Sequence, residues 1–173
     1  TPEALVNNAG ILDLQTRVVG MNAERIQRIF AVKVTGSFLC AREAVKRRST
    51  KFGGKCGSIV NLSSGAAKYG SPGEYVDYAA SKAAIDTLTI GLAKEVAEEG
   101  IRVNAVRPGF IDTEIHQSGG EPDRMERVRP LVPMKRVGRQ KRLRMQSCGC
   151  FLIRPPTPPE RFLMSAEDVN KLS

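Results

Sequence analysis

Apolar residues in the first part of the chain form two patterns, short and mainly apolar runs and long repeats at helical spacing. The short runs lack the two-residue alternation of half-exposed strands, so they predict strands buried on both faces. They are Ala4–Val6, Ser58–Leu62 and Arg102–Val106. The repeats predict a long amphipathic helix from Asn22 to about Arg48 and an alanine-rich helix from Tyr78 to Glu99, closed by Gly100. This order of elements predicts an α/β fold with a doubly wound parallel sheet.

Each predicted strand ends in polar sequence that contains glycine or serine. These ends are Asn7–Gly10, Ser63–Gly65 and Arg107–Gly109. In parallel sheets, ligands bind beyond the carboxyl ends of the strands. We therefore expect the functional site to be built from these three segments.

The most informative chemistry lies at the start of the second helix. Tyr78 and Lys82 are four residues apart, so their side chains share one helix face. A free tyrosine has a pKa of about 10, and a neighbouring cation favours its phenolate. We expect Lys82 to tune Tyr78 as a general acid and base. Ser64, at the end of the preceding strand, can hold a carbonyl or alcohol oxygen beside the phenol.

Each of these features has an ordinary explanation when it is taken alone. A tyrosine and a lysine at this spacing are more often an exposed helix face than a catalytic pair. Asn7–Gly10 can be any turn, and Ser64 can cap a helix. Their joint order, with each at a predicted strand end, favours hydride transfer coupled to proton transfer.

Four segments together resemble the signatures of the short-chain dehydrogenase/reductase family, in the correct order. They are Asn7–Gly10, Ile59–Ser64, Tyr78–Lys82 and Arg102–Gly109. The resemblance covers Leu5 to Arg139 and is greatest to a sugar-dehydrogenase-like, bacterial-type branch. It implies a Rossmann-like sheet and an oxidoreductase that moves hydride between NAD or NADP and a secondary alcohol or carbonyl, with sugars or other polyols as one candidate class.

The resemblance also implies roles for individual residues. Tyr78 would be the catalytic acid and base, Lys82 would bind the nicotinamide ribose, and Ser64 would orient the substrate, with Ser63 the less favoured alternative. Tyr75 has alanine four residues later and is not expected to be catalytic. The remaining cofactor contacts would be Asn8, Ala9 and Gly10 on the adenosine side and Pro108, Gly109, Ile111 and Thr113 on the nicotinamide side. The family also implies a homo-oligomer.

Two departures from the family pattern bear on activity. Lys33 stands where the family carries the asparagine of its proton relay, and a second ammonium would repel Lys82. The chain begins at the family's fourth strand, so the first β-α units and the glycine-rich phosphate loop are missing. We therefore expect the 173-residue polypeptide not to bind NAD(P)H saturably by itself. The alternative function is an inactive remnant or a helix-mediated interaction module.

The sequence leaves the family pattern after Arg139. One choice of codons for Lys141 to Glu167, read two bases later, gives EVANAVLWLLSDPASYTTGAFLDVSGG, which resembles the family's C-terminus. A single lost base near Arg139 would produce this change. We expect residues 1–139 to be the C-terminal part of the catalytic domain and residues 140–173 to be an out-of-frame, mostly disordered tail.

Composition excludes few further functions. The net charge is +9, and nine Lys or Arg residues stand against one acid between Arg124 and Arg144. No aromatic side chain lies among them to stack on bases, so we expect a solvated face and no nucleic-acid partner. No apolar run approaches the about 20 residues of a membrane span, and we expect a cytoplasmic protein. The spacing of the four cysteines and the single His116 predicts neither a disulfide framework nor a metal site.

Overall fold

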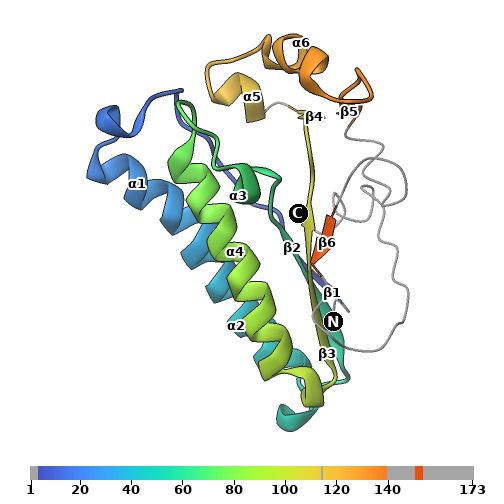
Figure 1. Ribbon diagram of the computed structural model, residues 1–173. Coiled ribbons are helices and arrows are strands. Elements are labelled where there is room, and N and C mark those ends of the chain that lie inside the picture. The colour runs from blue at the N-terminus through green and yellow to red at the C-terminus, as the bar shows by residue number, and fades with distance from the viewer. Residues whose placement is uncertain (1–3, 114, 140–150, 154–173) are drawn as a thin grey trace.

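The computed structural model describes residues 4–113, 115–139 and 151–153. A sheet runs through the molecule, and a long helix that contains α1 and α2 lies beside helix α4 on one of its faces (Figure 1). Strand β3 leads upward into a smaller unit that contains α5 and α6. The α/β class predicted from the sequence is confirmed.

The three predicted strands form a parallel sheet. They are β1 (Ala4–Asn7), β2 (Gly57–Leu62) and β3 (Ile101–Arg107), in the order β1-β2-β3. Ala4 is paired with Ser58, and Gly57 is paired with Ile101. Because all three strands run in one direction, their carboxyl ends meet at one edge, as the sequence predicted.

The predicted helix from Asn22 to Arg48 is continuous but changes its winding. It consists of α1 (Ala23–Phe30), a π-helical segment η2 (Ala31–Thr35) and α2 (Gly36–Arg48). The Asn22 side chain accepts a hydrogen bond from the Arg25 backbone N–H and so caps the helix start. The π-helical segment is wound more widely than an α-helix. Lys33 lies within it, and its side chain is buried.

The second predicted helix begins two residues earlier than expected. It is α4 (Val76–Glu95), followed by the 3-10 turn η4 (Ala97–Glu99). Gly100 ends this segment with a φ of 74°, a left-handed conformation that glycine adopts without steric cost. The core between the helices and the sheet contains Ala41, Ile59, Ala93, Val96, Ile101 and Val103.

Short elements complete the described chain. They are η1 (Val18–Gly20), η3 (Thr50–Phe52), α3 (Ala66–Tyr69), α5 (Ile115–Ser118), α6 (Arg124–Val128) and η5 (Arg129–Leu131). Strand β4 (Ile111–Asp112) pairs in parallel with β5 (Gly138–Arg139). No helix among the described residues is long and apolar enough to cross a membrane.

The predicted tail lies mostly outside the described residues. Its described part is β6 (Phe151–Ile153), which pairs antiparallel with β3. Cys40 and Cys56 are exposed free thiols, whereas Cys148 and Cys150 fall outside the described ranges. Among the described side chains, no group of three His, Cys, Asp or Glu residues is arranged to hold a metal ion.

Candidate active site

Backbone hydrogen bonds hold the carboxyl ends of β2 and β3 together. The Ser63 N–H donates to the Val106 carbonyl at 2.9 Å, and the Gly65 N–H donates to the Pro108 carbonyl at 2.9 Å. The end of β1 is joined to β2 by the Asn7 side-chain amide, which donates to Asn61 Oδ1 at 2.8 Å. The predicted site segments therefore lie at one edge of the sheet.

Tyr78 and Lys82 lie one turn apart on α4, as their spacing predicted. The Lys82 Nζ is 5.8 Å from the centre of the Tyr78 ring. Lys82 is 6% exposed, and its Nζ donates a hydrogen bond to the Leu62 carbonyl at the end of β2. This contact fixes the ammonium at the carboxyl end of the sheet beside the phenol.

Ser63 and Ser64 have different surroundings. Ser63 is buried, and its hydroxyl donates to the Lys82 carbonyl at 3.2 Å. The half-buried Ser64 accepts a hydrogen bond from the Ala66 N–H at 3.1 Å at the start of α3, and its side chain is near enough to Tyr78 to lower the pKa of the phenol. Ser64 is therefore the serine next to the phenol, whereas Ser63 holds α4 against β2.

The pKa of Tyr78 is shifted by its surroundings. Burial raises it above the ordinary value, and the Ser64 hydrogen bond and the positive charge of Arg124 oppose this rise only in part. Burial also lowers the pKa of Lys82 to about 8, and the charge of Asp86 opposes this fall. Desolvation of the phenolate outweighs nearby positive charge and sets the net direction of the shift, so the expectation that Lys82 lowers the Tyr78 pKa stays a prediction.

Lys33 also lies at the site. It is 2% exposed, and its Nζ lies 4.5 Å from the centre of the Tyr78 ring, with no hydrogen-bond partner among the described residues. Burial, and then repulsion by Lys82, lower its pKa to about 7. Its position next to Lys82, expected from the sequence, is confirmed by this repulsion.

The residues expected to contact a cofactor differ in exposure. Asn8, Ala9, Gly10 and Gly109 are exposed, and Pro108 and Thr113 are half-buried. Ile111 is 7% exposed, and its Cδ1 occupies the space that a side chain on Gly138 would need. The Ile111 side chain thus packs within the β4–β5 pair. The remaining residues leave backbone and small side chains available along the strand ends.

Two ion pairs near the site, one of them largely buried, were not predicted from the sequence. Arg25 of α1 pairs with Asp77 of α4 at 2.6 Å, next to Tyr78. Arg107, at the end of β3, pairs with Asp86 of α4 at 2.5 Å. No local sequence pattern indicates these contacts, because each joins residues of two different elements.

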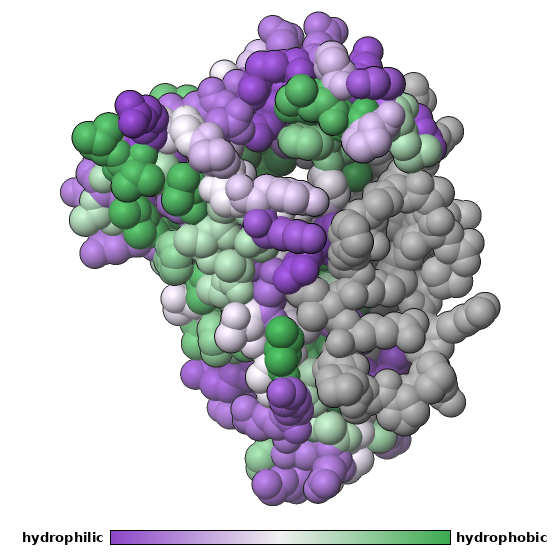
Figure 2. All heavy atoms as spheres, viewed as in Figure 1, coloured by the Kyte–Doolittle hydropathy of each residue, from purple (hydrophilic) through white to green (hydrophobic). Residues whose placement is uncertain are grey.

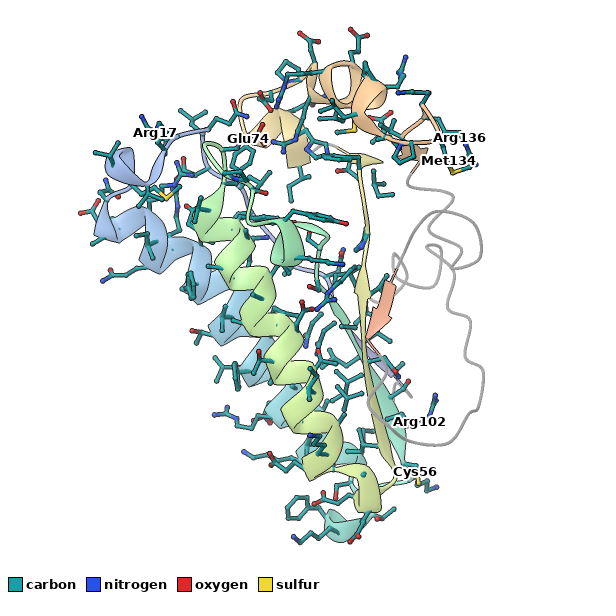
Figure 3. The ribbon with its side chains drawn as sticks, viewed as in Figure 1. Arg17, Cys56, Glu74, Arg102, Met134 and Arg136 are labelled. Carbon is teal, nitrogen blue, oxygen red and sulfur yellow. The ribbon has the colours of Figure 1, made fainter. Side chains whose placement is uncertain are left out.

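An ion-pair cluster connects the α5–α6 unit to the loop before α4. Glu74, labelled in Figure 3, accepts from Arg124 at 2.5 Å and from Arg127 at 2.8 Å. The Arg124 guanidinium lies 4.8 Å from the centre of the Tyr75 ring, and the Tyr75 hydroxyl donates to the Gly119 carbonyl at 3.1 Å. Tyr75 therefore holds this unit in place, which fits its exclusion from the chemistry.

The surface is hollowed between the α5–α6 unit and the body of the molecule below it (Figure 2). The carboxyl ends of β2 and β3 point toward this region (Figure 1). A separate cavity of about 440 Å³ lies at the opposite ends of the strands, where Leu5, Ala44 and Ile101 line it. That cavity is apolar and distant from Tyr78 along the strands, so it does not belong to the candidate site.

Comparisons with known proteins identify the family. The family described as Enoyl-(Acyl carrier protein) reductase matches residues 1–155. The uncharacterized oxidoreductase YgfF of Escherichia coli (strain K12) is 65% identical over 135 residues, which are 78% of this chain and 55% of that protein. The chloroplastic NADPH-dependent aldehyde reductase-like protein of Arabidopsis thaliana is 39% identical over 138 residues, covering 79% of this chain and 50% of that protein.

A solved structure agrees with these sequences. The 3-ketoacyl-(acyl-carrier-protein) reductase from Brucella melitensis, complexed with NADH, has a TM-score of 0.71 at 28% identity and covers 79% of this chain and 55% of that chain. The present chain thus spans about half the length of the relatives it matches. From the matching family, the relatives and the shared fold, the chain belongs to the short-chain dehydrogenase/reductase family.

Proposed function

We propose that this chain carries the proton-transfer half of an NAD(P)-dependent oxidoreductase active site, which acts on a secondary alcohol or carbonyl. The observation that carries the proposal is the meeting of Tyr78, Lys82 and Ser64 at the carboxyl ends of parallel strands. The half-buried Tyr78 phenol, whose pKa is raised, keeps its proton and is a suitable acid for a carbonyl oxygen that gains negative charge.

Each residue has a separate role in this proposal. Tyr78 donates its phenolic proton to the carbonyl oxygen during reduction and takes it back from the alcohol during oxidation. Ser64 donates a hydrogen bond to the same oxygen and orients it toward Tyr78. Lys82, held by the Leu62 carbonyl, would bind the ribose hydroxyls of the cofactor, and it stabilises the phenolate that forms when Tyr78 loses its proton.

The described residues fit the nicotinamide part of such a cofactor. Gly109 leaves the main chain accessible on the nicotinamide side, where Lys82 provides a buried donor, and the small, exposed Ala9 lies on the adenosine side. NAD(P)H supplies the hydride when it is bound. The names of the relatives include NADPH for one and NADH for another, which supports either nucleotide here.

The substrate class is part of the proposal. Sugars and other polyols are the candidates suggested by the sequence. The names of two relatives mention aldehyde and 3-ketoacyl reductases, so aldehydes and 3-oxoacyl thioesters belong in the same screen. We propose a homo-oligomer, with α4 as the packing helix, a cytoplasmic location, and neither nucleic acid nor membrane as a partner.

The function is tested with a chimera and with the chain itself. In the chimera, residues 4–139 replace the matching part of the 65% identical E. coli protein, which supplies the remaining half of the fold. We expect the chimera to oxidise NADPH or NADH with at least one carbonyl in the screen. The 173-residue chain should show no saturable quenching of NAD(P)H fluorescence. A folded chimera without any turnover would favour the inactive remnant or interaction module.

A further inference from the structure

Lys33 is a buried lysine to which the proposed chemistry gives no role. Its Nζ lies between the loop after β1 and helix α4. On one side it occupies space that a side chain on Gly10 would need, at 2.5 Å from an added Cβ. On the other side it lies 4.5 Å from the centre of the Tyr78 ring. An amine buried without a hydrogen-bond partner among the described residues costs much more free energy when it is charged than when it is neutral.

The acids on the packed elements do not neutralise Lys33. Three of them form ion pairs with arginines: Asp13 with Arg28, Asp77 with Arg25, and Asp86 with Arg107. Of the others, Glu24 on α1 is exposed, and Glu43 on α2 is bonded to Arg42 and Lys46. The titratable groups that face Lys33 are Tyr78 and Lys82, both from α4.

Two lysines therefore share one phenol. Both Nζ atoms lie over the Tyr78 ring, at 4.5 Å for Lys33 and 5.8 Å for Lys82. Only Lys82 has a described acceptor, the Leu62 carbonyl. Two ammonium groups at such a site repel each other, and the group without an acceptor loses its proton first. The pKa of Lys33, about 7, against about 8 for Lys82, agrees with this order.

We propose that Lys33 is a positioning residue that controls the charge at Tyr78. Its amine is neutral in the working state, which leaves Lys82 as the cation beside the phenol. When Lys33 takes up a proton, Lys82 is driven toward its neutral form and loses its hold on the phenolate and on the ribose. The proposal rests on the roles proposed above for Tyr78 and Lys82, but its test needs no turnover.

The test measures the titration of single lysines in the full 173-residue chain. The Nζ and Cε signals of isotope-labelled lysine are followed by NMR from pH 5 to 11, and substitutions assign Lys33 and Lys82. We expect a midpoint near 7 for Lys33, as its burial predicts. A midpoint for Lys33 at the ordinary value of 10.5 would overturn the proposal, whether it came from a folded or an unfolded chain.

Two variants separate an electrostatic role from a structural one. Lys82→Met removes the charge that repels Lys33, so the Lys33 midpoint should rise by about half a unit or more. Lys33→Arg makes the charge permanent, so the Lys82 midpoint should fall by a similar amount. Lys33→Met should leave the Lys82 midpoint unchanged, because Lys33 is already neutral where Lys82 titrates, and Lys94→Met on the exposed face of α4 is the matched control. An unchanged Lys33 midpoint in Lys82→Met, or an unchanged Lys82 midpoint in Lys33→Arg, would contradict the proposal.

Failure here is distinct from failure of the proposed function. Full activity of a Tyr78→Phe chimera would overturn the acid-base role of Tyr78. The lysine midpoints measured in the unsubstituted chain would stand whatever that result is. An unchanged Lys82 midpoint in Lys33→Arg, together with loss of activity in Tyr78→Phe, would support the proposed function and show that Lys33 has no part in it.

Discussion

Burial is the main cause of the shifted pKa values at the site. It raises the pKa of Tyr78 and lowers those of Lys33 and Lys82 to about 7 and about 8. All three shifts favour the neutral form of the side chain, so burial disfavours charge on Tyr78, Lys33 and Lys82.

Lys33 should make stability depend on pH. Its pKa is lower in the folded chain than the ordinary 10.5, so the unfolded chain binds the extra proton between pH 7 and 10.5. The free energy of unfolding therefore rises with pH across this window. Lys33→Met should be more stable than wild type at pH 6.5, by on the order of 3 kcal/mol, and this gain should shrink toward pH 10. Urea unfolding at several pH values measures it, and a constant difference would refute it.

The paired serines should separate catalysis from packing. Ser64→Ala removes the hydroxyl next to Tyr78 and should lower kcat of the chimera by about 10²-fold. Ser63→Ala loses the bond to the Lys82 carbonyl, so it should cost about 1 kcal/mol of stability and keep most of the activity. Steady-state kinetics and urea unfolding of both variants check this, and the reverse pattern would assign the catalytic role to Ser63.

Helix α4 is held in place by ion pairs with its neighbours. Asp77 is 1% exposed at its side chain and pairs with Arg25 of α1 at 2.6 Å. Asp77→Asn leaves a nearly buried guanidinium without its carboxylate and should destabilise the chain by about 3 kcal/mol. Circular dichroism during urea unfolding measures the change. Glu43→Gln, which breaks exposed pairs on α2, is the control, and an equal loss in both variants would show that burial of the pair is unimportant.

The sequence pattern predicted the helices and strands better than it predicted local winding and pKa values. The three strands, both long helices and the Gly100 cap follow from apolar runs, helical repeats and glycine placement. The π turn at Ala31–Thr35 did not, since its composition is ordinary for an α-helix. The Tyr78–Lys82 pairing follows from spacing along one helix. The direction of the Tyr78 pKa shift does not, because it depends on how other elements bury the phenol.

On the scale of the whole molecule, the reading frame after Arg139 is the main structural proposal. We propose that residues 140–173 follow a lost base. Two observations favour the opposite account. The family match extends beyond Arg139 to residue 155, and β6, which lies after Arg139, pairs with β3. Resequencing the locus should reveal one missing base near the Arg139 codon. An unchanged sequence would contradict the frameshift and make residues 140–173 a genuine part of the protein.

The central claim, that Tyr78 transfers the proton, is tested most directly by the turnover of two tyrosine variants. Tyr78→Phe in the chimera should lower kcat by about 10²–10⁴-fold with the fold unchanged, because the general acid is removed. Tyr75→Phe removes a hydroxyl that bonds the Gly119 carbonyl, and it should retain most of the activity. Carbonyl-dependent oxidation of NADPH and NADH measures both. Turnover of Tyr78→Phe equal to that of Tyr75→Phe would contradict the account.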